Sequence, residues 1–158
     1  MTRRVSLRVF RRLKDAKGTS LVEAALITPL LLLLTFSICE FSSLFYVYLA
    51  LENGVSQATR YGVTGNVSGS MSREDSIKQA MRDATPTITL PDSAFTFSSM
   101  PLGGTTWATG TAGGPDDLER VTVDYTWKIM TPLLWPFFTS GQIHFTVDST
   151  MKNESRFK

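Results

Sequence analysis

The most prominent pattern along the chain is a long apolar run close to its N-terminus. Residues 24–39 carry no charge, and after Glu40 a further eleven uncharged residues follow, 41–51. A helix needs about 20 apolar residues to span the ~30 Å hydrocarbon core of a bilayer. A single segment can satisfy its backbone in lipid only as a helix. The pattern therefore predicts one transmembrane helix, over about residues 21–46.

The helix is expected to continue beyond the membrane. In residues 46–65 apolar side chains recur every three or four positions, at Val47, Leu51, Val55 and Ala58. Gly65 begins the stretch "GNVSGS", which is typical of the end of a helix. We therefore expect one long helix over residues 19–64, whose outer part packs against a domain outside the membrane.

The remaining part of the chain, residues 65–158, shows shorter patterns. Residues 70–86 have the period of an amphipathic helix, with Ser72 as its N-cap. The segment 131–140 contains two prolines and predicts a turn or a short helix. The glycine-rich segment 100–117 predicts a mobile loop that offers Trp107 to a partner.

Alternating apolar and polar residues predict the strands of this outer region. The alternation is clearest in residues 119–129 and 141–151, and two shorter strands are expected at 87–90 and 94–99. Alternation of this kind is typical of an antiparallel sheet with one polar face and one face packed on a helix. The expected fold class is α+β: a single N-terminal transmembrane helix that extends into a small domain and carries the sheet.

Charge is distributed unevenly along the chain. The first 17 residues contain seven Lys or Arg against one Asp, whereas the rest has nine basic and thirteen acidic residues. The positive-inside rule places such a basic leader, residues 1–18, in the cytoplasm and the C-terminal domain outside it. A secretory signal peptide would have a shorter apolar core, of about 7–15 residues. Because the basic character is confined to the leader, the sequence pI of 8.8 does not indicate nucleic-acid binding.

Residues that often carry chemistry are few and scattered. Cys39 is the only cysteine and is interpreted as a small buried hydrophobe inside the apolar run. His144 is the only histidine and falls on the polar face of its strand. Asp116, Asp117 and Glu119 are interpreted as a solvated turn rather than a calcium site. The sequence therefore predicts no catalytic residues, no metal or other cofactor, and no small-molecule substrate.

The junction between the leader and the apolar run has a specific pattern. Gly18 is followed by four residues and then by Glu23, at the fifth position of the helix. This arrangement resembles the processing site of type IV prepilins. The helix start "GTSLVEAALITPLLLLL" and the C-terminal "STMKNES" (149–155) resemble TadE-like proteins, the pseudopilins of tight-adherence (Tad/Flp) pilus systems. Major Flp pilins are much shorter, and Ala24 stands where they usually have Tyr, so the resemblance points to a minor pilin.

The resemblance carries expectations for particular residues and partners. Prepilin peptidase, in the inner membrane, would cut after Gly18 and leave Thr19 as the first residue of the mature chain. Glu23 would then pair with the terminal amine of a neighbouring pilin, since each charge alone is costly in an apolar filament core. The residues themselves also allow Glu23 to snorkel to the headgroups. Pro29 is expected to kink the helix, either to loosen it for extraction or as an ordinary membrane-helix kink.

Glu40 is a second carboxylate inside the apolar run. With Ser37 and Ser43 it forms a narrow polar stripe along one side of the helix. Such a stripe most often faces another helix. The alternative is that Glu40 lies near the outer interface and is hydrated.

Two functions follow from the sequence. The first is a minor pilin (pseudopilin), cleaved by prepilin peptidase, that acts with other pilins and the pilus assembly machinery in assembling a Tad/Flp-type pilus for adhesion or secretion. The second is an uncleaved bitopic membrane anchor with an extracytoplasmic protein-binding domain. The two differ in one observable, the mature N-terminus. Neither function is enzymatic.

Overall fold

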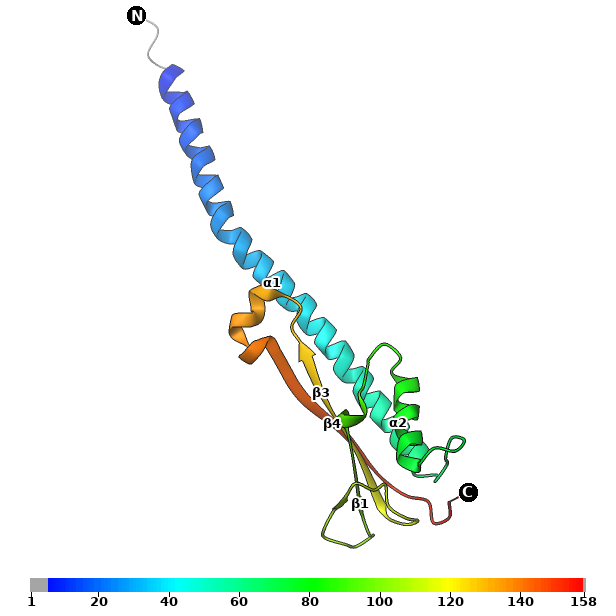
Figure 1. Cartoon of the computed structure of the whole chain (residues 1–158). Helices are drawn as coiled ribbons and strands as arrows, with labels where there is room; N and C mark the ends of the chain where they lie inside the picture. Colours follow the sequence, from blue (N-terminus) through cyan, green and yellow to red (C-terminus); the bar gives the residue numbers. More distant parts are fainter. Residues whose placement is uncertain (1–5, 158) are drawn as a thin grey trace, which may run out of the picture.

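A single long helix runs through the computed structural model, which describes the backbone of residues 6–157 and the side chains of residues 18–157. Helix α1 extends over Ser6–Gly62, and its N-terminal half projects far beyond the rest of the fold (Figure 1). In the described part of the chain, one helix is long and apolar enough to cross a membrane, over Gly18–Gly62. The charged side chains of the basic leader lie outside the described residues.

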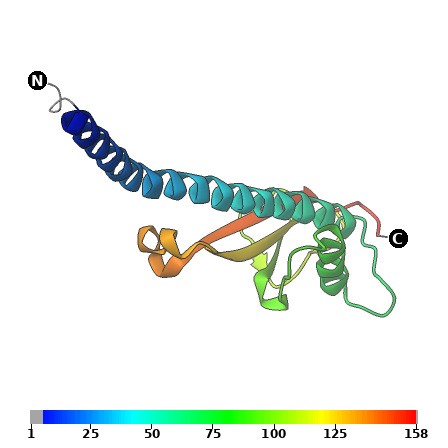
Figure 2. The same ribbon diagram turned by 90° about the horizontal axis from the view of Figure 1, so that it is seen from above.

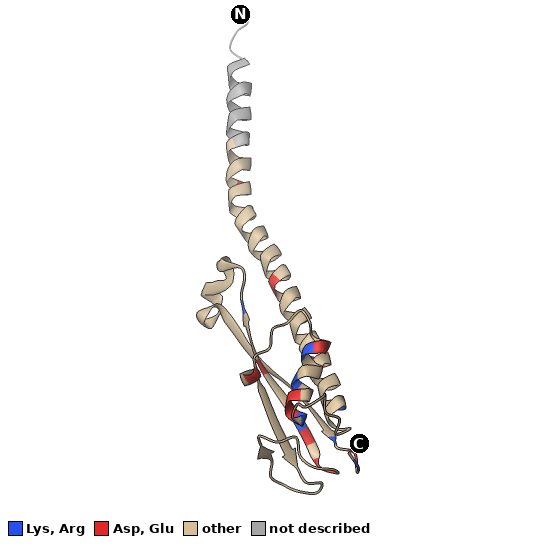
Figure 3. Ribbon diagram, turned by 45° about the vertical axis from the view of Figure 1, so that its right-hand side comes forward, with Lys and Arg blue, Asp and Glu red and all other residues tan. Residues whose placement is uncertain are grey.

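Helix α1 begins at Ser6, within the predicted leader rather than at residue 19, and ends two residues earlier than expected. Gly65 has a φ of +69°, which only glycine adopts without strain, and its N–H bonds to the carbonyl of Gly62. The helix runs unbroken through Pro29 and curves along its length (Figure 2). Whether Pro29 itself causes a functional kink stays a prediction. Charged residues gather on the outer domain, and the described N-terminal half of α1 is nearly free of them (Figure 3).

The predicted amphipathic helix is confirmed as α2, Arg73–Ala84. The Ser72 side chain accepts a hydrogen bond from the Asp75 N–H at 3.0 Å, which satisfies one of the free donors of the first turn. Ile77 and Met81 are fully buried and face the outer part of α1. The close approach depends on Gly54, because a Cβ there would lie 2.5 Å from a methyl group of Thr85.

The sheet has four antiparallel strands in the order β2-β1-β3-β4. Strands β3 (Leu118–Lys128) and β4 (Gln142–Lys152) pair over their whole length, whereas β1 (Phe95–Met100) pairs only with the first half of β3. Strand β2, Ala108–Thr109, is a short edge strand within the predicted loop. The three longer strands confirm the predictions for 94–99, 119–129 and 141–151, and each end differs from its prediction by one residue.

The prediction of a strand at 87–90 is wrong. Ile88 and Leu90 are buried, as the alternation implied, but the segment is irregular and leads into the 3₁₀ helix η1, Asp92–Ala94. The Ile88 N–H bonds back to the carbonyl of Thr85, so the chain turns at the end of α2. Apolar residues alone do not make a strand when a turn bond takes the backbone donor.

One face of the sheet packs on α1 and forms the core. Leu51, Val55 and Ala58 of the helix are fully buried, together with Val121 and Val123 of β3. The opposite face is polar and exposed; its exposed residues in the second half of β3 and the facing part of β4 are Asp124, Thr126, Lys128, Gln142, His144 and Thr146. The α+β fold class, with an antiparallel sheet packed on the outer half of a long apolar helix, is therefore confirmed.

The connection between β3 and β4 returns to α1. It consists of two 3₁₀ helices, η2 (Pro132–Phe137) and η3 (Thr139–Gly141), which confirms the predicted turn or short helix. Figures 1 and 2 show this connection, in orange, beside the middle of α1. In the loop after β1, Trp107 does not offer its ring freely, because Arg120 lies over it at 3.9 Å.

Candidate functional site

The predicted processing junction lies on the part of α1 that no other element covers. Gly18, Thr19 and Glu23 are all exposed, and a Cβ on Gly18 would meet nothing within 4 Å. The bond between Gly18 and Thr19 lies inside the helix, so a peptidase must open the helix there. Glycine favours such opening, since it destabilises a helix by about 1 kcal/mol relative to alanine.

Glu23 makes no salt bridge with any side chain in the described part of the chain, residues 18–157. It stands on an apolar and exposed stretch of helix, with Leu21, Val22, Leu26 and Ile27 as its exposed neighbours. A cation for this carboxylate must therefore come from another molecule or from residues outside the described side chains.

Glu40 has partners within its own chain. Its side chain is buried, and both carboxylate oxygens accept hydrogen bonds: Trp127 Nε1 and the Met130 N–H donate to Oε1, each at 3.0 Å. The Thr131 N–H and hydroxyl donate to Oε2 at 3.2 and 3.0 Å. We call these four residues the Glu40 clasp. A carboxylate with several donors is well solvated even without a cation.

The Glu40 clasp differs from the expected contact with another helix. Glu40 faces the end of β3 because the β3–β4 connection returns to α1 at this level. The hydroxyls of Ser37 and Ser43 donate back to the carbonyls of Leu33 and Cys39 and take no part in the clasp. Cys39 itself is exposed rather than buried.

A second polar cluster joins the far end of α1 to the rest of the domain. Arg73 Nη2 lies 2.7 Å from Glu119 Oε2 and 2.9 Å from both the Gly62 carbonyl and Asn153 Oδ1. Arg73 also donates to the carbonyl of Gly113. We call these five residues the Arg73 hub. It connects the end of α1, the start of α2, the loop before β3 and the C-terminal segment.

Glu119 corrects the expectation of a solvated acidic turn. It is fully buried, and its Oε1 has no hydrogen-bond partner. Burial raises the pKa of Glu119 to about 7, although Arg73 opposes the shift. Asp116, by contrast, is part of a surface turn: hydrogen bonds from Lys152 and Ser155 hold the pKa of its carboxyl below the usual range. No group of three or more potential metal ligands occurs among the described residues.

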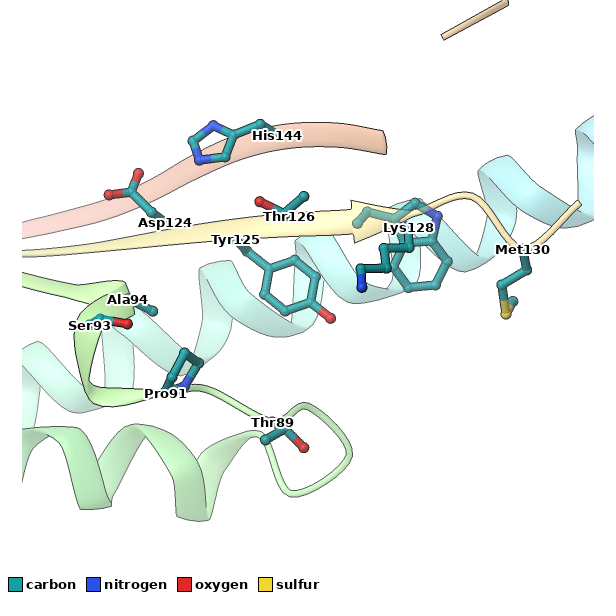
Figure 4. Close-up of a pocket in the computed structure, with 11 residues that line it drawn as sticks. Thr89, Pro91, Ser93, Ala94, Asp124, Tyr125, Thr126, Lys128, Met130 and His144 are labelled. Carbon is teal, nitrogen blue, oxygen red and sulfur yellow. The ribbon is translucent and has the colours of Figure 1, made fainter. Parts of the chain in front are cut away.

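An open hollow lies beside β3 where β1 no longer covers its edge. Thr89, Pro91 and Ser93 form one side, and Tyr125 and Lys128 the other (Figure 4). His144, at the rim, lies on the opposite side of the sheet from Tyr125. The hollow adjoins the Glu40 clasp, because Trp127 and Met130 also line it.

The fold and these two polar clusters define a class: an α+β protein in which one long apolar helix, a candidate membrane span, continues as the central helix of the outer domain. Residues 18–60 match the family model described as TadE-like protein. The match covers 43 of the 158 residues, so it shows that the long helix is similar to that of TadE-like proteins, a family associated with Tad pili. The match includes Gly18, Glu23, Pro29 and Glu40 and ends before α2. Comparison with curated proteins and with solved structures gives no match.

Sequence reasoning missed Arg73 and Asn153. Asn153 lies in the C-terminal segment that supported the resemblance, and its Nδ2 donates to the carbonyls of Ala112 and Gly114 at 3.0 and 2.8 Å. The available signal was Glu119, a charged residue at an inward-facing position of the β3 alternation. Such a position implies a buried cation partner without saying which one.

Proposed function

We propose that this protein is a minor pilin of a Tad/Flp-type pilus system, processed after Gly18 by prepilin peptidase. It is inserted in the inner membrane with its N-terminus in the cytoplasm and its outer domain on the extracytoplasmic side. The observation that carries the proposal is the exposed, uncovered stretch of α1 from Gly18 onward, which presents Gly18 and Glu23 at the beginning of the TadE-like match.

The free surface of α1 supports a role in assembly. From Gly18 to Cys39 every side chain is exposed or half-exposed, and apart from Glu23 none is charged. Such a surface can contact lipid in the membrane and the helices of other pilins in a filament. Cleavage would create an ammonium group at Thr19, and Glu23 of a neighbouring pilin would supply its counter-charge. Pairing makes both charges tolerable in an apolar filament core.

The first experiment determines the mature N-terminus. Intact-mass analysis of the protein from cells with and without prepilin peptidase should show a chain starting at Thr19 only when the peptidase is present. Gly18→Val should leave the full-length form in the membrane. Ala25→Val, a similar change on the exposed helix beyond the junction, should be cleaved normally. A wild-type chain that starts at Met1 in piliated cells would refute processing and support the uncleaved anchor.

The second experiment separates Glu23 from cleavage. Glu23→Gln keeps the shape of the side chain and removes its charge, so we expect a cleaved and membrane-resident protein that fails to associate with other pilins. Losing one member of a buried pair typically costs about 3–5 kcal/mol. Cross-linking and a pilus count in a strain without the native copy measure the effect. Normal association and piliation would show that Glu23 only snorkels.

A further inference from the structure

The connection between β3 and β4 exposes an unusual group of large apolar side chains. Met130, Leu133, Trp135 and Phe137 are 67%, 49%, 51% and 69% exposed. We call residues 130–138 the tip. In the rest of residues 65–157, the exposed large apolar residues stand singly, at Val67, Met71 and Leu102. Single exposed apolar residues are ordinary, whereas a contiguous group marks an interaction surface.

The Glu40 clasp fixes the level of the tip along α1. Phe138 also contacts Phe41, with ring centroids 6.3 Å apart. The part of α1 that precedes the clasp and is uncovered, residues 18–39, is about 33 Å long at 1.5 Å per residue. The hydrocarbon core of a bilayer is ~30 Å thick. If α1 crosses the membrane with this uncovered stretch, the tip lies at the outer boundary of the hydrocarbon.

The backbone of the tip is suited to an environment with little water. Pro132 and Pro136 have no N–H, and the Leu134 and Phe138 N–H groups bond to carbonyls inside the tip at 3.0 and 3.1 Å. The indole N–H of Trp135 donates to the carbonyl of Ile129 at 2.9 Å. Polar backbone groups that enter a membrane must be satisfied in this way.

The charges around the tip fit the same environment. The sequence contains no Asp, Glu, Lys or Arg from residue 129 to 147. The nearby carboxylate of Glu40 accepts four hydrogen bonds, so its charge is solvated by protein donors. Lys128, exposed where β3 meets the tip, can place its ammonium group among lipid headgroups while its stem lies on apolar surface.

We propose that the tip is a second membrane contact of this protein. Leu133, Trp135 and Phe137 insert into the boundary between headgroups and acyl chains of the outer leaflet, in the manner of interfacial apolar side chains. The continuity of the tip with the membrane-spanning helix, through the Glu40 clasp, is the reason to assign it to lipid. The contact fixes the orientation of the sheet relative to the membrane surface. It does not depend on cleavage after Gly18.

Spin labels on the full-length protein test the proposal. The natural cysteine is removed by Cys39→Ser, and a label is attached after Leu133→Cys or, as a matched control, Leu102→Cys. Leu102 is equally apolar and 62% exposed, but it follows β1 at the opposite end of the sheet. The protein is placed in nanodiscs of phosphatidylcholine and phosphatidylglycerol at one copy per disc. Collision with oxygen, which dissolves in lipid, is compared with collision with a water-soluble nickel complex.

We expect the oxygen-to-nickel accessibility ratio at position 133 to exceed that at position 102 several-fold. Phe137→Cys provides a second position in the tip, and a variant is used only when its tryptophan emission matches that of the Cys39→Ser parent. Equal accessibility of the tip and position 102 to the nickel complex would overturn the proposal. The proposal would also be overturned if the tip were shielded from the nickel complex only when a disc holds two copies, because the tip would then be an interface between copies.

Discussion

The buried carboxyl of Glu119 should make the stability of the outer domain fall as the pH rises towards neutrality. The folded protein holds the Glu119 proton up to a pKa of about 7, whereas an unperturbed glutamate loses it near 4.5. Between these values the folded state binds more protons than the unfolded state, so the free energy of unfolding decreases with increasing pH. The stabilising contribution is complete below pH 4.5 and is lost above about pH 7.

The magnitude follows from the two pKa values. Their difference, from 4.5 to about 7, corresponds to about 3 kcal/mol at most. Arg73 favours the ionised form of Glu119 and Glu74 disfavours it, and the pKa of about 7 includes both effects. Asp75, Asp92 and Asp116 act in the opposite direction, because their lowered pKa values give stability that is lost as the pH falls below about 4. These exposed groups therefore do not affect the range from pH 5 to 8.

The assay is urea unfolding of the full chain in detergent micelles, followed by tryptophan fluorescence between pH 5 and pH 8. All three tryptophans, Trp107, Trp127 and Trp135, lie in the outer domain and report its unfolding. Glu119→Gln cannot titrate, so its stability should not change over this range. Glu154→Gln removes an exposed carboxyl and should keep the wild-type slope.

Two results would contradict the reasoning about Glu119. One is a wild-type stability that is flat from pH 5 to 8, which would mean that Arg73 keeps the carboxylate ionised in the folded state. The other is a Glu119→Gln variant that retains the full slope, which would assign the pH dependence to a different group.

Two further predictions concern packing along α1. Leu51→Ala should lower the free energy of unfolding by about 2–5 kcal/mol, because Leu51 is fully buried in the core, whereas Leu49→Ala, at a side chain that is 58% exposed, should change it little. Equal losses in urea unfolding would show that the outer half of α1 is not the spine of the domain. Gly62→Ala should destabilise the fold although alanine has the better helix propensity, because the new Cβ would lie 2.5 Å from Glu119 Oε1. Gly114→Ala is the control, because a Cβ at residue 114 would make only an ordinary contact at 3.6 Å. A Gly62→Ala protein as stable as wild type would be inconsistent with the Arg73 hub.

Most helices and strands of this protein could be predicted from its sequence. The uncharged run after Glu23 predicted a long apolar helix that could cross a membrane, because length and apolarity suffice for that prediction. The alternation of β3 and β4 determined which side chains point inward, since successive strand residues face opposite sides. The N-cap Ser72 marked the start of α2. Each of these predictions depends only on residues close together in the chain.

Tertiary structure alone decided the partners of the two buried carboxylates. Glu40 bonds to residues 87 to 91 positions away, and Glu119 to an arginine 46 positions away. The periodicity of the sequence shows which face of a helix or strand a residue occupies, but it does not show which element packs against that face. The same limit explains the segment 87–90, where apolar residues are buried without forming a strand. The return of the β3–β4 connection to α1, which creates the Glu40 clasp and sets the level of the tip, is a long-range event that no local pattern encodes.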